Sequence, residues 1–154
     1  MPIVEIYADQ YRVPLETILS DSTHGEMSDF GLIVVRLVDE KGRVGLGYTY
    51  TVNTIGAGAV WKIIESDLAP LLQGANPAAI DALWRRMWWH LHFIGRGGVA
   101  SFAMAAVDIA LWDLRGHRES LALWRLLGGS QSKVFAYAGG IDLDLPIQNL
   151  LSQA

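Results

Sequence analysis

The sequence predicts an α+β fold in which a three-stranded antiparallel meander precedes a helical bundle and then one β/α unit. Short apolar runs bounded by turn residues fill the first third of the chain, which is typical of strands. After residue 54, apolar residues recur at the spacing of helices. Only 18% of the 154 residues are charged and 51% are hydrophobic; an average domain has about 25% charged residues. We therefore expect a buried core and apolar surface left for another part to cover.

Three strands are expected, over residues 3–13, 32–38 and 44–50. Residues 39–42 join the second strand to the third, because their glycine can adopt a positive φ. The polar residues 19–29 separate the first two strands. They are too many for a tight hairpin turn and too polar to bury, so we expect a long loop.

Helices are expected from residue 60 onward. The first covers residues 60–72, with Gly74 just after its end. The second opens with Asn76 as the N-cap and Pro77 at the first helical position, and the glycine-rich residues 95–98 end it.

A third helix is expected over residues 99–115, with Gly116 ending it and a short helix following over residues 121–127. Three small residues share one face of this helix and allow close approach of another element: Ala103, Ala106 and Ala110. Residues 134–138 are then expected as a strand, and a helix begins at Leu145 with no cap before the end of the chain.

The charge balance excludes a basic nucleic-acid-binding surface, because 12 Lys+Arg against 16 Asp+Glu give a net charge of −4. The absence of cysteine removes disulfides, thiolate zinc sites and cysteine nucleophiles. Residues 1–9 do not resemble a signal peptide, and no apolar run is long enough to span a membrane. We expect a cytoplasmic protein with neither a nucleic-acid partner nor a membrane partner.

Two motifs that could bind cofactors are better explained by structure. Gly56 and Gly58 stand between a strand and a helix, but Trp61 occupies the place of the third glycine of a dinucleotide-binding fingerprint. His90 and His92 are two residues apart on a helix, whereas a helical metal pair needs a spacing of four. Packing and hydrogen bonding are the expected roles of both motifs.

Asp108 and Asp113 could form a carboxylate pair, but their spacing of five places them on different faces of a helix. We expect them to have structural roles. His24 differs, because a polar loop can direct it toward a ligand. A solvated histidine remains the alternative, and spacing alone defines no Ser/His/Asp triad.

The third helix carries a recognisable signature. The run AMAAVDIALWDLRGH from Ala103, followed by LALWRLLGG from Leu121, resembles the mandelate racemase/muconate lactonizing enzyme family of the enolase superfamily. Family members usually have Lys where this chain has His117, and Gly and Pro where it has Ser120 and Ala122. These departures affect the turn into the short helix more than any chemistry.

The resemblance implies a division into two parts. Residues 1–128 would form an N-terminal capping domain, and residues 129–154 would be the start of a TIM-like β/α barrel. The family removes a proton next to a carboxylate and stabilises the enediolate on Mg²⁺. Its catalytic bases and Mg²⁺ ligands stand on later barrel strands, beginning with a Lys-x-Lys pair that this chain lacks. No catalytic and no metal residue is therefore expected here, and the fragment alone should be inactive.

Two capping-domain loops of the family contact substrate, and here they match residues 19–27 and 48–56. The expected substrate-binding residues are Ser22, Thr23, His24, Tyr50, Thr51 and Asn53. Their hydroxyls and amides favour a sugar acid, and so an acid-sugar dehydratase. The alternatives are a mandelate-type racemase, a muconate-type cycloisomerase or a non-catalytic cap-only interaction module. The expected partners are a carboxylate substrate, the rest of the barrel and, at full length, further copies of the chain.

Overall fold

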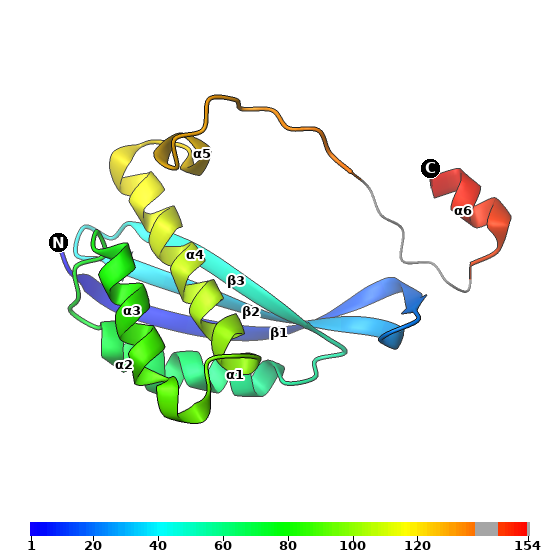
Figure 1. The fold of residues 1–154 in the computed structure, drawn as a ribbon, viewed down its shortest axis with the longest axis horizontal. Coiled ribbons are helices and arrows are strands. Elements are labelled where there is room, and N and C mark those ends of the chain that lie inside the picture. Colours follow the sequence, from blue (N-terminus) through cyan, green and yellow to red (C-terminus); the bar gives the residue numbers. More distant parts are fainter. Residues whose placement is uncertain (138–144, 154) are drawn as a thin grey trace.

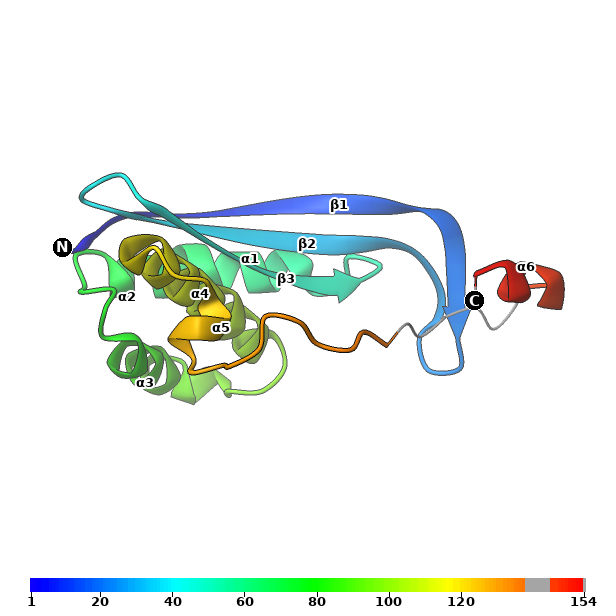
Figure 2. The ribbon, with the colours of Figure 1, turned by 90° about the horizontal axis from the view of Figure 1, so that it is seen from above.

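The computed structural model describes residues 1–137 and 145–153. Three antiparallel strands form one sheet in the order β1-β2-β3, and helices cover one of its faces (Figures 1 and 2). The strands are β1 (Ile3–Asp21), β2 (Gly25–Asp39) and β3 (Val44–Val52). The expected meander is confirmed.

The long loop expected over residues 19–29 is wrong. β1 continues to Asp21 and pairs with β2 as far as Gly25, so only three residues form the turn. The carboxylate of Asp21 satisfies two backbone N–H groups of this turn, and Gly25 has a φ of 66°. Polar residues form a tight turn here because one aspartate replaces the missing backbone partners. Figure 2 shows this hairpin extending beyond β3 and bending toward the helix side of the sheet.

The helical part contains one π-helical turn, η1, and one 3₁₀ turn, η2. The elements in chain order are α1 (Ala57–Ile63), η1 (Ile64–Leu68), α2 (Ala69–Leu72), α3 (Ile80–His90), η2 (His92–Ile94), α4 (Val99–Glu119), α5 (Leu123–Leu126) and α6 (Ile147–Gln153). None of the helices in the described residues is both long and apolar enough to cross a membrane.

Two helix boundaries differ from expectation. α3 begins at Ile80 rather than at Pro77, because the Asn76 side chain accepts a hydrogen bond from the N–H of Ala78 and forms a separate turn. α4 continues through Gly116 to Glu119, and Ser120, the residue that follows it, has a left-handed conformation. Gly74, with a φ of 76°, follows the end of α2 as expected.

The small face of α4 packs against glycines of β3. A Cβ atom at Gly47 would lie 2.0 Å from the carbonyl oxygen of Ala106, and one at Gly45 would lie 2.2 Å from that of Ala110. Both alanines are fully buried. The predicted close approach is therefore confirmed, and the element that approaches is a strand whose glycines leave room for the helix backbone.

No strand forms over residues 134–137, and residue 138 of the expected strand lies outside the described residues. The side chains of Val134 and Phe135 are 89% and 107% exposed. A parallel strand needs neighbours and cover on both faces, and this segment has neither among the described residues. The expected helix is present from Ile147.

Candidate functional site

A hollow of about 500 Å³ opens where the end of β3 meets the hairpin tip and the first turns of α4. The hairpin supplies one lining residue, the end of β3 and the following loop supply six, and α4 supplies one. They are His24, Thr49, Tyr50, Thr51, Val52, Asn53, Ile55 and Phe102. The two segments expected to contact a ligand therefore meet in space, although about 25 residues separate them in the chain.

The hollow contains four of the six residues that the sequence suggested. His24, Tyr50, Thr51 and Asn53 line it. Ser22 and Thr23 belong to the same turn as His24 and are exposed, but they are not part of the lining.

The imidazole of His24 is held in place by Asp21. Asp21 Oδ2 lies 2.7 Å from His24 Nδ1, and Asp21 Oδ1 accepts the backbone N–H groups of Thr23 at 2.8 Å and of His24 at 2.5 Å. The pKa of Asp21 is lowered to about 2. The main cause is the hydrogen bond from the backbone N–H of His24, and the next is the hydrogen bond with the His24 side chain. Asp21 is thus ionised at neutral pH. The sequence analysis did not predict that Asp21 holds the imidazole of His24. The signal that could have shown it is their spacing of three residues within a turn.

Tyr50 and Thr51 lie on opposite faces of β3. Tyr50 is 56% exposed and packs edge-to-face against Phe30, with ring centroids 5.5 Å apart. Thr51 is on the helix side, only 8% exposed, and its Oγ1 has no hydrogen-bond partner among the described residues. Tyr50 therefore presents a phenol to solvent, whereas the hydroxyl of Thr51 is enclosed.

Asn53 ties the end of β3 to the base of the hairpin. Its Oδ1 accepts the N–H of Ser28 at 3.0 Å, and its Nδ2 donates to the carbonyl oxygen of Glu26 at 2.8 Å. The backbone N–H of Asn53 donates to the carbonyl oxygen of Asp29 at 2.9 Å. Its side-chain amide is thus already engaged, and its geometric effect is to hold the two walls of the hollow together.

Three apolar residues complete the hollow and were missed by sequence reasoning, namely Val52, Ile55 and Phe102. Ile55 is 76% exposed and Phe102 is 44% exposed. Ile55 lies within the expected loop of residues 48–56 but is apolar, and Phe102 lies on α4, far along the chain from both expected loops. Nothing in their own spacing predicts that they line one hollow. The hollow is therefore mixed, with polar groups on the hairpin and β3 and apolar groups beside them.

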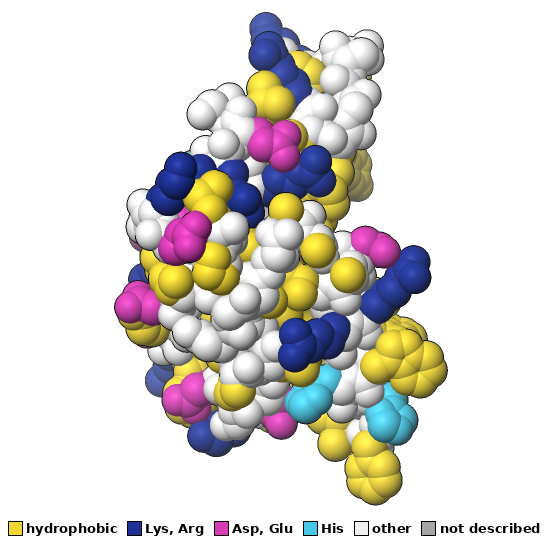
Figure 3. Space-filling model, turned by 90° about the vertical axis from the view of Figure 1, so that its left-hand side faces the viewer, with side chains coloured by type: hydrophobic (Ala, Val, Ile, Leu, Met, Phe, Trp, Pro, Cys, Tyr) yellow, Lys and Arg dark blue, Asp and Glu magenta, His cyan; other side chains and the backbone are white. Residues whose placement is uncertain are grey.

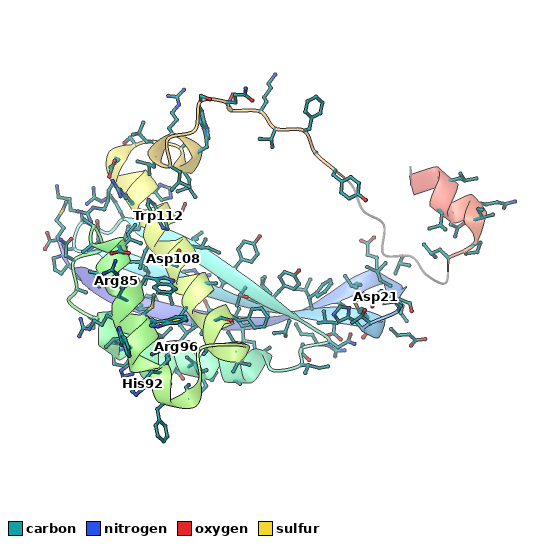
Figure 4. The ribbon with its side chains drawn as sticks, in the orientation of Figure 1. Asp21, Arg85, His92, Arg96, Asp108 and Trp112 are labelled. Atoms are coloured by element: carbon teal, nitrogen blue, oxygen red, sulfur yellow. The ribbon has the colours of Figure 1, made fainter. Side chains whose placement is uncertain are left out.

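Two of the other candidates make hydrogen bonds of the structural kind that was expected. His92 Nδ1 lies 2.8 Å from the carbonyl oxygen of Trp89. Asp113 accepts the N–H of Leu46 at 2.8 Å and so ties α4 to the edge of β3. Asp108, whose pKa is raised by burial, lies on α4 away from the hairpin tip that carries Asp21 (Figure 4).

The three-stranded meander with helices on one face, followed by an unpartnered segment, defines a capping domain of the enolase type. The family "Mandelate racemase / muconate lactonizing enzyme, N-terminal domain" matches residues 6–128. The chain belongs to this family, within the enolase superfamily, as its α4 signature indicated.

Three relatives show how far the similarity extends. A 3,6-anhydro-alpha-L-galactonate cycloisomerase of Streptomyces coelicolor is 54% identical over 99% of this chain and 42% of its own length. An L-talarate/galactarate dehydratase of Salmonella typhimurium is 30% identical over 90% of this chain and 36% of its own. A crystal structure of a racemase from Streptomyces coelicolor with bound magnesium has a TM-score of 0.95 and 53% identity, over 98% of this chain and 42% of that one. The chain thus spans about two fifths of the length of these relatives.

Magnesium is present in solved relatives of the family. In the part of this chain that the structure describes, no three His, Asp or Glu side chains gather as a metal site would require. The described residues therefore do not fit a magnesium ion, and what this chain supplies is the hollow.

Proposed function

We propose that the whole protein removes a proton next to the carboxylate of a sugar acid and eliminates a group from the neighbouring carbon. Residues 1–128 would form the cap that closes over the substrate, and residues 129–154 the start of the barrel. The observation that carries this proposal is the hollow, which joins the hairpin tip to the end of β3. The printed activities of the relatives, on sugar acids such as galactarate and anhydro-galactonate, support it.

The same chemistry covers the two reactions named for the relatives. Loss of the proton on carbon 2 gives an enediolate, and its electrons can expel the oxygen on carbon 3. In a dehydratase that oxygen takes up a proton and leaves as water. In a 3,6-anhydro acid it is the ring ether, which takes up a proton and stays on carbon 6 as a hydroxyl, so the ring opens and the product is an isomer. The 54% identical cycloisomerase favours ring opening as the second candidate reaction. In either case this chain's residues bind the part of the substrate far from the carboxylate.

Six residues are proposed to bind the substrate. Tyr50 and His24 present the side chains that the experiment tests, and the turn and strand end around them contribute Ser22, Thr23, Thr51 and Asn53. In the full-length enzyme, Tyr50→Phe and His24→Ala should each lower kcat/KM several-fold to about tenfold, because each removes one hydrogen bond. Tyr7→Phe is a matched control, since Tyr7 is an exposed tyrosine on β1 that bonds only Glu5 among the described residues.

The assay measures 2-keto-3-deoxy acid formed from a panel of hydroxylated and 3,6-anhydro sugar acids with Mg²⁺ present. Turnover of at least one of them, with loss in both variants and not in the control, supports the proposal. Absence of turnover across the panel would refute the activity. Unchanged kcat/KM in both variants would show that the hollow does not contact substrate.

Self-association of the full protein is a further part of the proposal. Trp89 and Phe93, 65% and 91% exposed, lie beside histidines on α3 and η2. Figure 3, which views the molecule from the left-hand side of Figure 1, shows yellow hydrophobic side chains and cyan histidines gathered at the lower right. Large exposed aromatic groups of this kind mark contact surfaces. Light scattering on the full protein tests this self-association.

We also propose a cytoplasmic location, where a cysteine-free chain needs no oxidising environment.

A further inference from the structure

We propose that Asp21 and His24 form a charge-compensated pair that makes the hollow select sugar acids with an uncharged far end over diacids. This inference rests on the proposed function and names the class of substrate for the same site. Asp21 would be a positioning residue that acts through His24, and His24 the group that meets the ligand.

The hairpin turn fixes the geometry of the pair. One carboxylate oxygen of Asp21 holds His24 Nδ1 at 2.7 Å, and the other accepts two backbone N–H groups. The Asp21 side chain is 29% exposed and that of His24 is 53% exposed. Because Nδ1 carries the hydrogen bonded to Asp21, Nε2 is the ring nitrogen left to meet a ligand.

The pair cannot carry a net positive charge while Asp21 is ionised. With one proton on the ring its net charge is −1, and with two protons it is zero. The other seven residues that line the hollow include no Lys, Arg, Asp or Glu. The second carboxylate of a diacid substrate would therefore lose its water in this hollow without gaining a counter-ion from the cap. That loss of hydration costs free energy.

The nearby arginines do not change this balance. Arg12 pairs with Asp29 at 2.8 Å, and Arg36 pairs with Asp9. Neither arginine lines the hollow. A neutral ligand end fits better, since Nε2 can accept a hydrogen bond from a hydroxyl while Ile55 and Phe102 pack against C–H groups.

The test compares two substrates in the full-length enzyme. Asp21→Asn keeps an oxygen that can accept the turn's N–H groups and removes the negative charge. The ratio of kcat/KM for galactarate, a diacid, to that for galactonate, a monoacid, should rise about three- to tenfold. His24→Ala added to Asp21→Asn should abolish the rise, because the ring through which Asp21 acts is then gone.

Asp9→Asn is the matched control, because it removes the same charge from an arginine pair outside the hollow. An unchanged ratio in Asp21→Asn, or an equal rise in Asp9→Asn, would overturn the inference. If the enzyme turns over neither of these two acids, the proposed function is judged on the full panel of sugar acids and not on this pair. Calorimetric binding of the two acids to the wild type then decides: weaker binding of the diacid supports the inference, and equal or tighter binding overturns it.

A second readout does not depend on activity. In long-range ¹H–¹⁵N spectra of the 154-residue chain, the neutral His24 ring should carry its proton on Nδ1, and Asp21→Asn should shift the tautomer mixture toward Nε2. A wild-type ring protonated mainly on Nε2 would contradict the pairing on which the inference depends.

Discussion

At the scale of single residues, one buried carboxylate organises the β2–β3 turn. Asp39 is fully buried and accepts hydrogen bonds from the backbone N–H groups of Lys41 and Arg43 and from Arg43 Nε, at 2.9 to 3.1 Å. Burial acts to raise the pKa of Asp39, but the hydrogen bonds from Arg43 and Lys41 and the charge of Arg43 together outweigh it, and the pKa is lowered. Its neighbours thus hold Asp39 as a carboxylate.

Asp39→Ala should lower the free energy of unfolding by about 2–3 kcal/mol, because two turn N–H groups and one guanidinium lose their acceptor. Urea denaturation of the 154-residue chain measures this. Glu40→Ala, in the same turn but exposed, should change stability by less than about 0.5 kcal/mol. Equal effects of the two substitutions would show that the buried carboxylate is not special.

Asp21 should make the hairpin tip sensitive to acid. Its pKa is lowered from 3.8 to about 2, so the folded tip favours the ionised form. The stabilisation is complete above the ordinary pKa of 3.8 and is lost as the pH falls toward 2. The ¹³C shift of the Asp21 carboxyl should titrate with a midpoint near 2. A midpoint near the ordinary value would contradict the hydrogen-bonded turn.

At the scale of elements, the contact between α4 and β3 depends on glycine. At Gly47 an added Cβ would meet the backbone oxygen of Ala106 and, at 2.6 Å, the backbone nitrogen of Ala110. Neither atom belongs to a side chain that could rotate away. The helix would have to move as a unit, and α4 supplies more of the buried core than any other helix.

Gly47→Ala should therefore destabilise the chain by about 1–3 kcal/mol, the usual range for overpacking. Gly97→Ala is the control, because a Cβ there meets nothing within 4 Å and its φ is not positive. Thermal unfolding followed by circular dichroism compares the two. A Gly47→Ala variant as stable as Gly97→Ala would mean that α4 does not pack this closely.

At the scale of the whole molecule, the chain forms a capping fold and leaves later parts unpartnered. Apolar side chains on β3 such as Leu46 and Tyr48 are 49% and 58% exposed, and Val134 and Phe135 are more exposed still. The apolar excess expected from the composition thus appears as open surface. Its relatives are more than twice as long as the matched region.

The 154-residue chain should bind Mg²⁺ with no defined stoichiometry. The carboxylates of the described residues form no group that could hold a metal, and those of Asp21 and Asp39 are already engaged by backbone N–H groups. Isothermal titration calorimetry with MgCl₂ should give only weak heats. One-to-one binding that is lost on changing a single acid, such as Asp142, would contradict the prediction.

The sequence by itself determined the order of the three strands and of the helices after them, the family, and the alanine face of α4, but not the absence of a strand over residues 134–137. Those features are local patterns, in which spacing and residue type fix the outcome. It failed where one side chain replaces backbone partners, as Asp21 does in the hairpin turn and Asn76 does before α3.

Only the tertiary structure decided which residues form the hollow. His24 and Tyr50 line one hollow because β1 and β2 extend past β3 and bend (Figure 2), while the Asn53 side chain is engaged by hydrogen bonds to the base of that hairpin. Ile55 and Phe102 join them from separate elements. Such a site depends on contacts between segments distant in the chain, and the spacing of residues along the chain does not encode those contacts.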